Sequence, residues 1–119
     1  MNDPITILLV DDHEVVVMAL RVTLERAPQF EVVGVARSAN DAIEQTEKLK
    51  PDIVLMDIRL PPGEKSGIDA CEVIVKRFPK TKVLMLTSYA EDELLFSAIT
   101  AGASGYMLKY INSNELIKS

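Results

Sequence analysis

Three aspartates follow or end apolar runs and are the residues of this chain best suited to chemistry. Asp11 and Asp12 come directly after the first apolar run, and Asp57 is the last residue of another. If these carboxylates converge, they repel one another unless a cation lies between them. Ligand sets made only of oxygen favour a hard ion such as Mg2+, so the pattern predicts a metal site.

Two further polar residues end apolar segments and add a second kind of chemistry. Thr87 can donate a hydrogen bond, and Lys109 supplies a compact positive charge, so together they suit a dianion. A phosphoryl group could then lie among Mg2+, Thr87 and Lys109, beside a carboxylate that attacks it. Taken singly, each of these residues is more often a helix cap or a solvated loop residue, so the prediction depends on their convergence.

Three other residues have simpler interpretations. His13 follows the aspartate pair, but a lone histidine at a helix start is more often exposed or structural than a metal ligand. Tyr106 lies in a predicted strand, where an aromatic residue is most simply core packing. Cys71 is the only cysteine, which excludes an internal disulfide, and its apolar spacing in a predicted helix indicates a buried structural thiol.

Alternating strand and helix patterns must bring the candidate residues together. Apolar runs predict five strands, at residues 5–10, 31–36, 52–57, 82–87 and 104–109. Helical periodicity and capping patterns predict helices at residues 14–27, 39–49, 66–78 and 91–101, and a last helix after Asn112. These alternations predict an α/β fold of three layers with a parallel sheet and right-handed crossovers. The candidate residues then share the carboxyl edge of the sheet, where such folds bind ligands.

The first predicted helix has a broad apolar face. Val17, Leu20 and Leu24 recur at spacings of three and four residues, which places them on one helical face. Val15, Val16 and Met18 broaden this face. The sequence therefore predicts that this helix is well buried.

Length and charge limit the domain organisation and the partners. The 119 residues fit one domain, and few residues follow the cap of the last predicted helix, so we expect the chain to be cut inside that helix or to lack a further domain. A net charge of -5 argues against direct binding of nucleic acid or of an anionic membrane. No signal-peptide pattern and no membrane-length apolar run is present, so we expect a soluble cytoplasmic domain.

Four blocks of the chain resemble the receiver domains of two-component response regulators. They are Val10-Asp11-Asp12-His13, Asp52-Ile53-Val54-Leu55-Met56-Asp57, Leu86-Thr87-Ser88-Tyr89 and Gly102-Ala103-Ser104-Gly105-Tyr106-Met107-Leu108-Lys109. The resemblance covers essentially the whole chain and is strongest to the NarL/LuxR type of transcription regulator. It implies a flavodoxin-like fold with strand order 2-1-3-4-5. It also implies that residues 1–119 are a single receiver domain whose parent protein carries a C-terminal helix-turn-helix DNA-binding domain, absent here.

The resemblance also implies roles for the acidic residues. Asp57 matches the phosphoacceptor, which takes a phosphoryl group from a sensor histidine kinase. Asp11 and Asp12 match the acidic pair that holds Mg2+ together with Asp57. The backbone carbonyl of Arg59 matches a further ligand of the ion.

A conformational switch and its partners are implied in the same way. Thr87 and Lys109 match the hydroxyl and the cation that bind the phosphoryl group, and Tyr106 matches the aromatic switch residue that turns inward with Thr87. The domain would be a phosphoacceptor that assists its own phosphorylation and dephosphorylation, and not an enzyme for an external substrate. Its implied partners are the kinase and a second copy in a homodimer on phosphorylation. It would contact DNA only through the absent domain, and no membrane.

Two features depart from the family pattern, and three alternatives remain open. The loop at residues 61–67 is longer than usual, and Tyr110 follows Lys109 where many relatives have Pro or Asp. An interaction module that signals without phosphorylation would not need the complete polar set. A phosphohydrolase with an aspartyl-phosphate intermediate would need a substrate-recognition cap, for which the chain has little room. Flavin binding is disfavoured because no phosphate loop rich in Gly, Ser or Thr follows the first strand.

Overall fold

A parallel sheet with helices on both sides forms the structure, a computed structural model that describes residues 3–58, 60, 66–87 and 92–108. The strands are β1 (Ile5–Val10), β2 (Phe30–Ala36), β3 (Ile53–Asp57), β4 (Lys82–Thr87) and β5 (Gly105–Leu108). The helices of this described part are α1 (Glu14–Glu25), α2 (Ala39–Leu49), α3 (Ser66–Arg77) and α4 (Asp92–Thr100). The strand order is β2-β1-β3-β4-β5 and all pairs are parallel, which confirms the predicted sheet.

Most element boundaries agree with the sequence prediction to within a residue or two. β1, β4 and α2 have the predicted bounds. α2 begins at Ala39 because the Ser38 hydroxyl accepts a hydrogen bond from the Asp41 amide at 3.2 Å. Within the described residues, no helix is both long enough and apolar enough to span a membrane. The predicted last helix, Tyr110 and most of the 61–67 loop lie outside the described residues.

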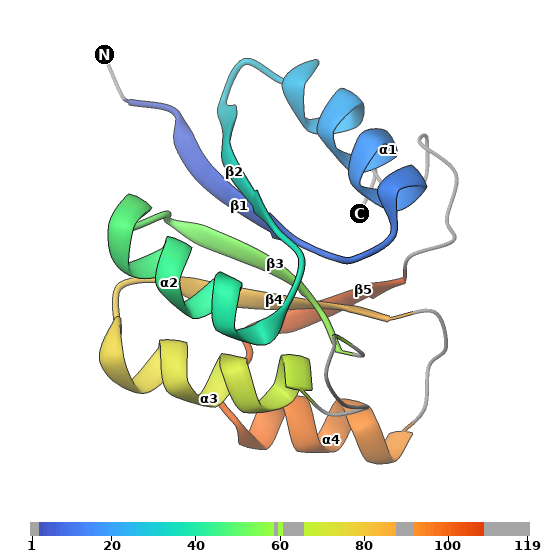
Figure 1. The fold of residues 1–119 in the computed structure, drawn as a ribbon, viewed down its shortest axis with the longest axis vertical. Helices are drawn as coiled ribbons and strands as arrows, with labels where there is room; N and C mark the ends of the chain where they lie inside the picture. Colours follow the sequence, from blue (N-terminus) through green and yellow to red (C-terminus); the bar gives the residue numbers. More distant parts are fainter. Residues whose placement is uncertain (1–2, 59, 61–65, 88–91, 109–119) are drawn as a thin grey trace.

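The sheet is the middle of three layers, with α1 on one face and α2, α3 and α4 on the other (Figure 1). Side chains of the central strands alternate between the two faces. In β1, Leu8 belongs to the same buried cluster as Ile74 of α3, whereas Leu9 belongs to the cluster that contains Leu20 of α1. Both faces of the central strands are therefore covered, which explains why their sequences are almost continuously apolar.

The structure corrects the prediction that α1 is well buried. Val17 and Leu20 are buried against the sheet, but Val15 is 78% exposed and Met18 is 64% exposed. Successive residues of a helix point about 100° apart, so the apolar positions of this segment cannot all face one sheet. The prediction is wrong because an apolar side chain on this helix is buried only where it faces the sheet.

The start of α3 lies directly against the end of β3. The amide of Gly67 donates a hydrogen bond to the carbonyl oxygen of Ile58 at 2.9 Å. A Cβ atom added to Gly67 would lie 1.9 Å from the backbone oxygen of Asp57 and 2.8 Å from Ile58 Cα. Only glycine allows this approach of two backbone segments, so Gly67 helps to hold the backbone at Asp57 in place.

Substituting Gly67→Ala tests this contact. The added methyl group must displace either α3 or the end of β3, so we expect the free energy of unfolding to fall by roughly 1–3 kcal/mol. Gly34→Ala is the matched control, because its closest contacts are the ends of the Gln45 and Leu49 side chains, which can move. Urea unfolding of both variants measures the difference, and equal losses would contradict the role given to Gly67.

A buried thiol gives a second prediction, on pH dependence. Cys71 is fully buried, as predicted, and its burial, with the charge of Glu72, raises the pKa of the thiol from 9.0 to about 11. The folded state therefore keeps this proton to a higher pH than the unfolded chain does. The stabilisation that the protonated thiol provides is fully present below the pKa of the thiol in the unfolded chain. It is lost as the pH rises through the pKa of the thiol in the folded state.

We therefore compare the wild type with Cys71→Ala across this range. As the pH rises from 9.0 to about 11, the wild type should lose on the order of 2 kcal/mol of its free energy of unfolding relative to Cys71→Ala. Denaturant unfolding at several pH values measures this loss. Lysine and tyrosine side chains titrate in the same pH range in both proteins, so the comparison with the alanine variant removes their contribution. A difference independent of pH would show that the thiol does not contribute in this way.

Candidate functional site

The carboxyl ends of β1 and β3 form the centre of the candidate site. Val10 of β1 is paired with Met56 of β3, so the next residues, Asp11 and Asp57, follow at the same level of the sheet. The chain crosses from β2, on one side of β1, to β3, on the other side, and ligands of such sheets bind where the strand order reverses. The fold therefore brings together two carboxylates that are far apart in the sequence.

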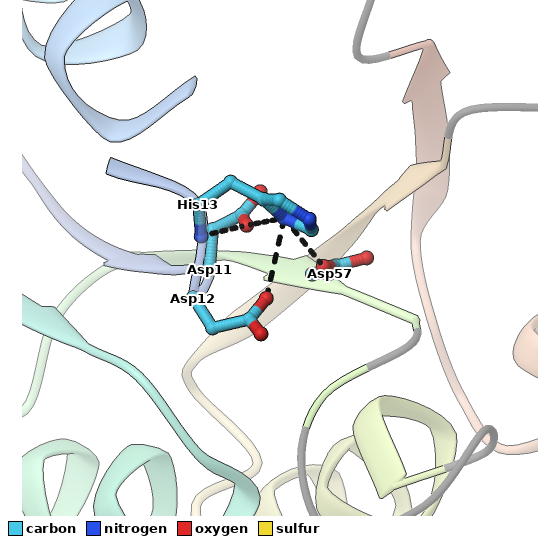
Figure 2. A group of neighbouring side chains, drawn as sticks. All are labelled: Asp11, Asp12, His13 and Asp57. Carbon is cyan, nitrogen blue, oxygen red and sulfur yellow. Dashed lines mark hydrogen bonds and ion pairs between the residues drawn. The ribbon is translucent and has the colours of Figure 1, made fainter. Parts of the chain in front are cut away.

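Four side chains meet at this edge (Figure 2). Asp11, Asp12, His13 and Asp57 each offer one ligand atom, and these atoms all lie within 4.8 Å of one another. The side chains of Asp11 and Asp57 are only 1% and 4% exposed, whereas those of Asp12 and His13 are 36% and 55% exposed. The cluster thus has a buried floor and a side that is open to solvent.

His13 contacts all three carboxylates of the cluster. Its Nδ1 atom lies 2.8 Å from Asp11 Oδ1, 3.2 Å from Asp12 Oδ1 and 3.9 Å from Asp57 Oδ2. The sequence pattern favours an exposed or structural histidine, and the ring is indeed half-exposed. It nevertheless lies in the cluster, and the signal that pointed to it was its place directly after the aspartate pair at a strand end.

The arrangement suits a divalent cation and a group transfer that needs one. Carboxylates this close repel one another, and the burial of Asp11 and Asp57 strengthens the repulsion because the effective dielectric constant there is lower than in water. A hard cation offsets the repulsion and accepts carboxylate oxygens as ligands. A carboxylate beside such an ion can also act as a nucleophile towards a phosphoryl group.

The other predicted site residues are placed only in part. Thr87 is the last residue of β4, and the backbone of this strand ends at the same edge of the sheet as Asp57. The Thr87 side chain, Arg59 and Lys109 lie outside the described part of the chain. Tyr106 is 49% exposed on β5, so the interpretation of this residue as ordinary core packing is wrong.

Sequence reasoning missed Gly67 as a residue that shapes the site. The capping pattern predicts a helix start at this residue, and α3 does begin at Ser66. Its contact with the backbone of Asp57 depends on how α3 packs on β3. No spacing or composition rule signals such an approach, because glycines are common beside helix starts and turns.

Comparison with known sequences agrees with this geometry. The family model described as response regulator receiver domain matches residues 7–119. The DNA-binding transcriptional activator DevR/DosR of Mycobacterium tuberculosis is 42% identical over 115 residues, which cover 97% of this chain and 52% of that protein. The oxygen regulatory protein NreC of Staphylococcus haemolyticus is 39% identical over 111 residues, which cover 93% of this chain and 51% of that protein. The chain thus spans about half the length of the curated relatives it matches.

Solved structures agree as well. A two-component response regulator of the LuxR family from an Aurantimonas species has a TM-score of 0.86 at 36% identity, covering 98% of this chain and 81% of that one. The signal receiver domain of the putative response regulator NarL from Mycobacterium tuberculosis has a TM-score of 0.89 at 25% identity, covering 98% and 93%. The fold, the acidic cluster and these matches lead to one conclusion: the chain belongs to the receiver-domain family of two-component response regulators, and the proteins it resembles include a transcriptional activator and a response regulator of the LuxR family.

Proposed function

We propose that this domain is a phosphoacceptor switch, in which Asp57 takes a phosphoryl group from a sensor histidine kinase while Mg2+ is bound beside it. The observation that carries the proposal is the convergence of Asp11, Asp12 and Asp57 at one edge of the sheet, within a cluster whose ligand atoms lie within 4.8 Å. Membership of the receiver-domain family indicates the class of reaction.

The donor set of the cluster fits a hard divalent ion, because carboxylate oxygens dominate it. We assign Asp12 as a direct ligand, since it is the most accessible of the three carboxylates, and Asp11 as its buried partner. The backbone carbonyl of Arg59 is a further proposed ligand. When bound, Mg2+ neutralises negative charge on the phosphoryl oxygens during transfer.

Asp57 is the proposed nucleophile because it ends β3, the central strand of the sheet, between β1 and β4. One of its carboxylate oxygens attacks the phosphorus atom of a phosphohistidine. A P–O bond forms as the P–N bond breaks, and the electron pair of the broken bond returns to the imidazole nitrogen of the kinase. Asp57 is 3% exposed, which limits the access of water to the acyl phosphate formed there.

Thr87 and Lys109 are proposed to recognise the transferred group. Thr87 donates a hydrogen bond to a phosphoryl oxygen, and Lys109 contributes a point charge. These contacts exist only when Asp57 is phosphorylated. They therefore shift the population of the domain towards the conformation in which Thr87 is drawn to the phosphoryl group and Tyr106 turns inward. Tyr106 is the proposed switch residue. Its 49% exposure leaves the ring room to move, and its strand neighbour is Met85, two residues before Thr87.

The proposed output acts through surfaces and domains outside the acidic cluster. Phe96 and Ile99 of α4 are 75% and 51% exposed, and such apolar side chains can contribute to a homodimer formed on phosphorylation. DNA binding is assigned to a C-terminal domain of the parent protein, since the relatives named as transcription regulators are about twice as long as the region matched. We propose that this signalling takes place in the cytoplasm.

Phosphorylation of Asp57 can be measured directly. Incubated with a small phosphodonor and Mg2+, the wild-type domain should gain the mass of one phosphoryl group, while Asp57→Asn should gain none because it lacks the nucleophile. Asp69→Asn is the matched control, since it changes an exposed aspartate on α3 and should behave as the wild type does. Intact-mass spectrometry records the result, and an equal gain in Asp57→Asn would refute the proposal.

Binding of Mg2+ should also stabilise the fold. A ligand that binds only the folded state adds about 2.7 kcal/mol to the free energy of unfolding at 100 times its dissociation constant. We expect such a gain in the wild type and a much smaller one in Asp12→Asn, which loses a charged ligand. Urea unfolding with and without Mg2+ measures both, and equal gains would show that the ion binds elsewhere.

A further inference from the structure

The backbone of His13 is hydrogen-bonded on one side to the acidic cluster and on the other side to α1. Its amide donates a hydrogen bond to Asp11 Oδ1 at 2.9 Å, and its carbonyl accepts one from Val17 at 3.1 Å. It precedes the first residue of α1, and its side chain makes no capping hydrogen bond. The ring is therefore directed to the carboxylates rather than to the helix end (Figure 2).

The spacing of the histidine nitrogen matches the spacing of ligands around one ion. Ions such as Zn2+ and Mg2+ hold nitrogen and oxygen ligands at about 2.1 Å. In an octahedron, adjacent ligands then lie about 3.0 Å apart and opposite ligands about 4.2 Å apart. The distances from Nδ1 to Asp11, Asp12 and Asp57 are 2.8, 3.2 and 3.9 Å. The nitrogen thus already lies at ligand separations from all three carboxylates.

We propose that His13 Nδ1 is a ligand of the divalent ion held by Asp11, Asp12 and Asp57, and that it sets the metal preference of the site. This inference rests on the proposed function, in which these carboxylates bind a divalent ion. Imidazole nitrogen suits ions such as Ni2+ and Zn2+, whereas Mg2+ prefers oxygen. The site therefore binds such transition-metal ions more tightly, relative to Mg2+, than a site of oxygen ligands alone.

The half-exposed ring makes this ligation possible without a rearrangement of the fold. The His13 side chain is 55% exposed, so the ring can turn at the open side of the cluster while the buried floor stays in place. Without an ion, Nδ1 lies at hydrogen-bond distance from Asp11 Oδ1. On metal binding, the lone pair of Nδ1 would bind the ion in place of this hydrogen bond. The ring proton then resides on Nε2, at the other side of the ring.

The composition of the chain makes the test specific, because His13 is its only histidine. We would prepare the domain without a histidine tag, add Ni2+, and record proton NMR spectra. Ligation by Nδ1 predicts one exchangeable ring N–H resonance, shifted by the paramagnetic ion, in the wild type. The resonance should be absent from His13→Asn, a variant chosen because asparagine is favourable at a helix start and should preserve α1.

Calorimetry of the same proteins provides the second readout. His13→Asn should lower the affinity for Ni2+ by at least about 10-fold, the lower limit of losses seen when residues that support metal ligands are changed. Its affinity for Mg2+ should change much less, so the ratio of the two affinities falls. Asp12→Asn is the control that should weaken the binding of both ions.

The outcomes separate this inference from the proposed function. If Mg2+ binds and Asp57 is phosphorylated, but Ni2+ yields no shifted ring resonance or His13→Asn leaves the affinity ratio unchanged, the role of His13 is refuted and the proposed function stands. Tighter binding of both ions by His13→Asn would also refute it, because the ring would then compete with the ion. If the wild type binds neither ion, both proposals fail.

Discussion

The repulsion of three carboxylates at one edge of the sheet is the constraint on which the rest of this structure depends. Asp11 and Asp57 are almost fully buried, where charges interact more strongly than they do in water. They stay together because the strands that lead to them, β1 and β3, are paired in the sheet and covered on both faces. The core thus maintains a concentration of negative charge that favours a divalent cation.

Rigidity is distributed unevenly over the candidate site. Asp57 has a confined backbone, since the start of α3 packs against it at Gly67 and its strand is central in the sheet. Asp12 and His13 lie at the more exposed start of α1. A fixed nucleophile beneath an accessible side suits the proposed reaction, in which the phosphorylated imidazole of another protein must reach Asp57 in a defined direction.

The exposure of α1 shows where sequence patterns lose information. The segment has apolar residues on two sides, and Leu20 packs on the sheet whereas Met18 does not. Periodicity identifies an apolar stripe, but with two overlapping stripes it does not indicate which of them meets the sheet. That choice depends on the positions of β1 and β3 beneath the helix, which are distant parts of the fold.

The sequence by itself determined the order of the elements, the parallel sheet, the buried Cys71 and the three aspartates at strand ends. These features follow from local properties, namely apolar runs, helical periodicity and the residues that end them. Thr87 and Lys109 remain predictions as phosphoryl-binding residues, because their side chains lie outside the described part of the chain.

Only the tertiary structure decided how the residues of the site meet. The approach of His13 to Asp57 joins segments that the chain connects only through α1, β2 and α2, and Gly67 meets the backbone of Asp57 although residues 58–66 separate them. Such contacts arise from strand register and helix packing, so neighbouring residues in the sequence do not encode them. The sequence therefore indicated which carboxylates could act together, and the packing of β1, β3 and α3 decided that a histidine nitrogen would lie among them.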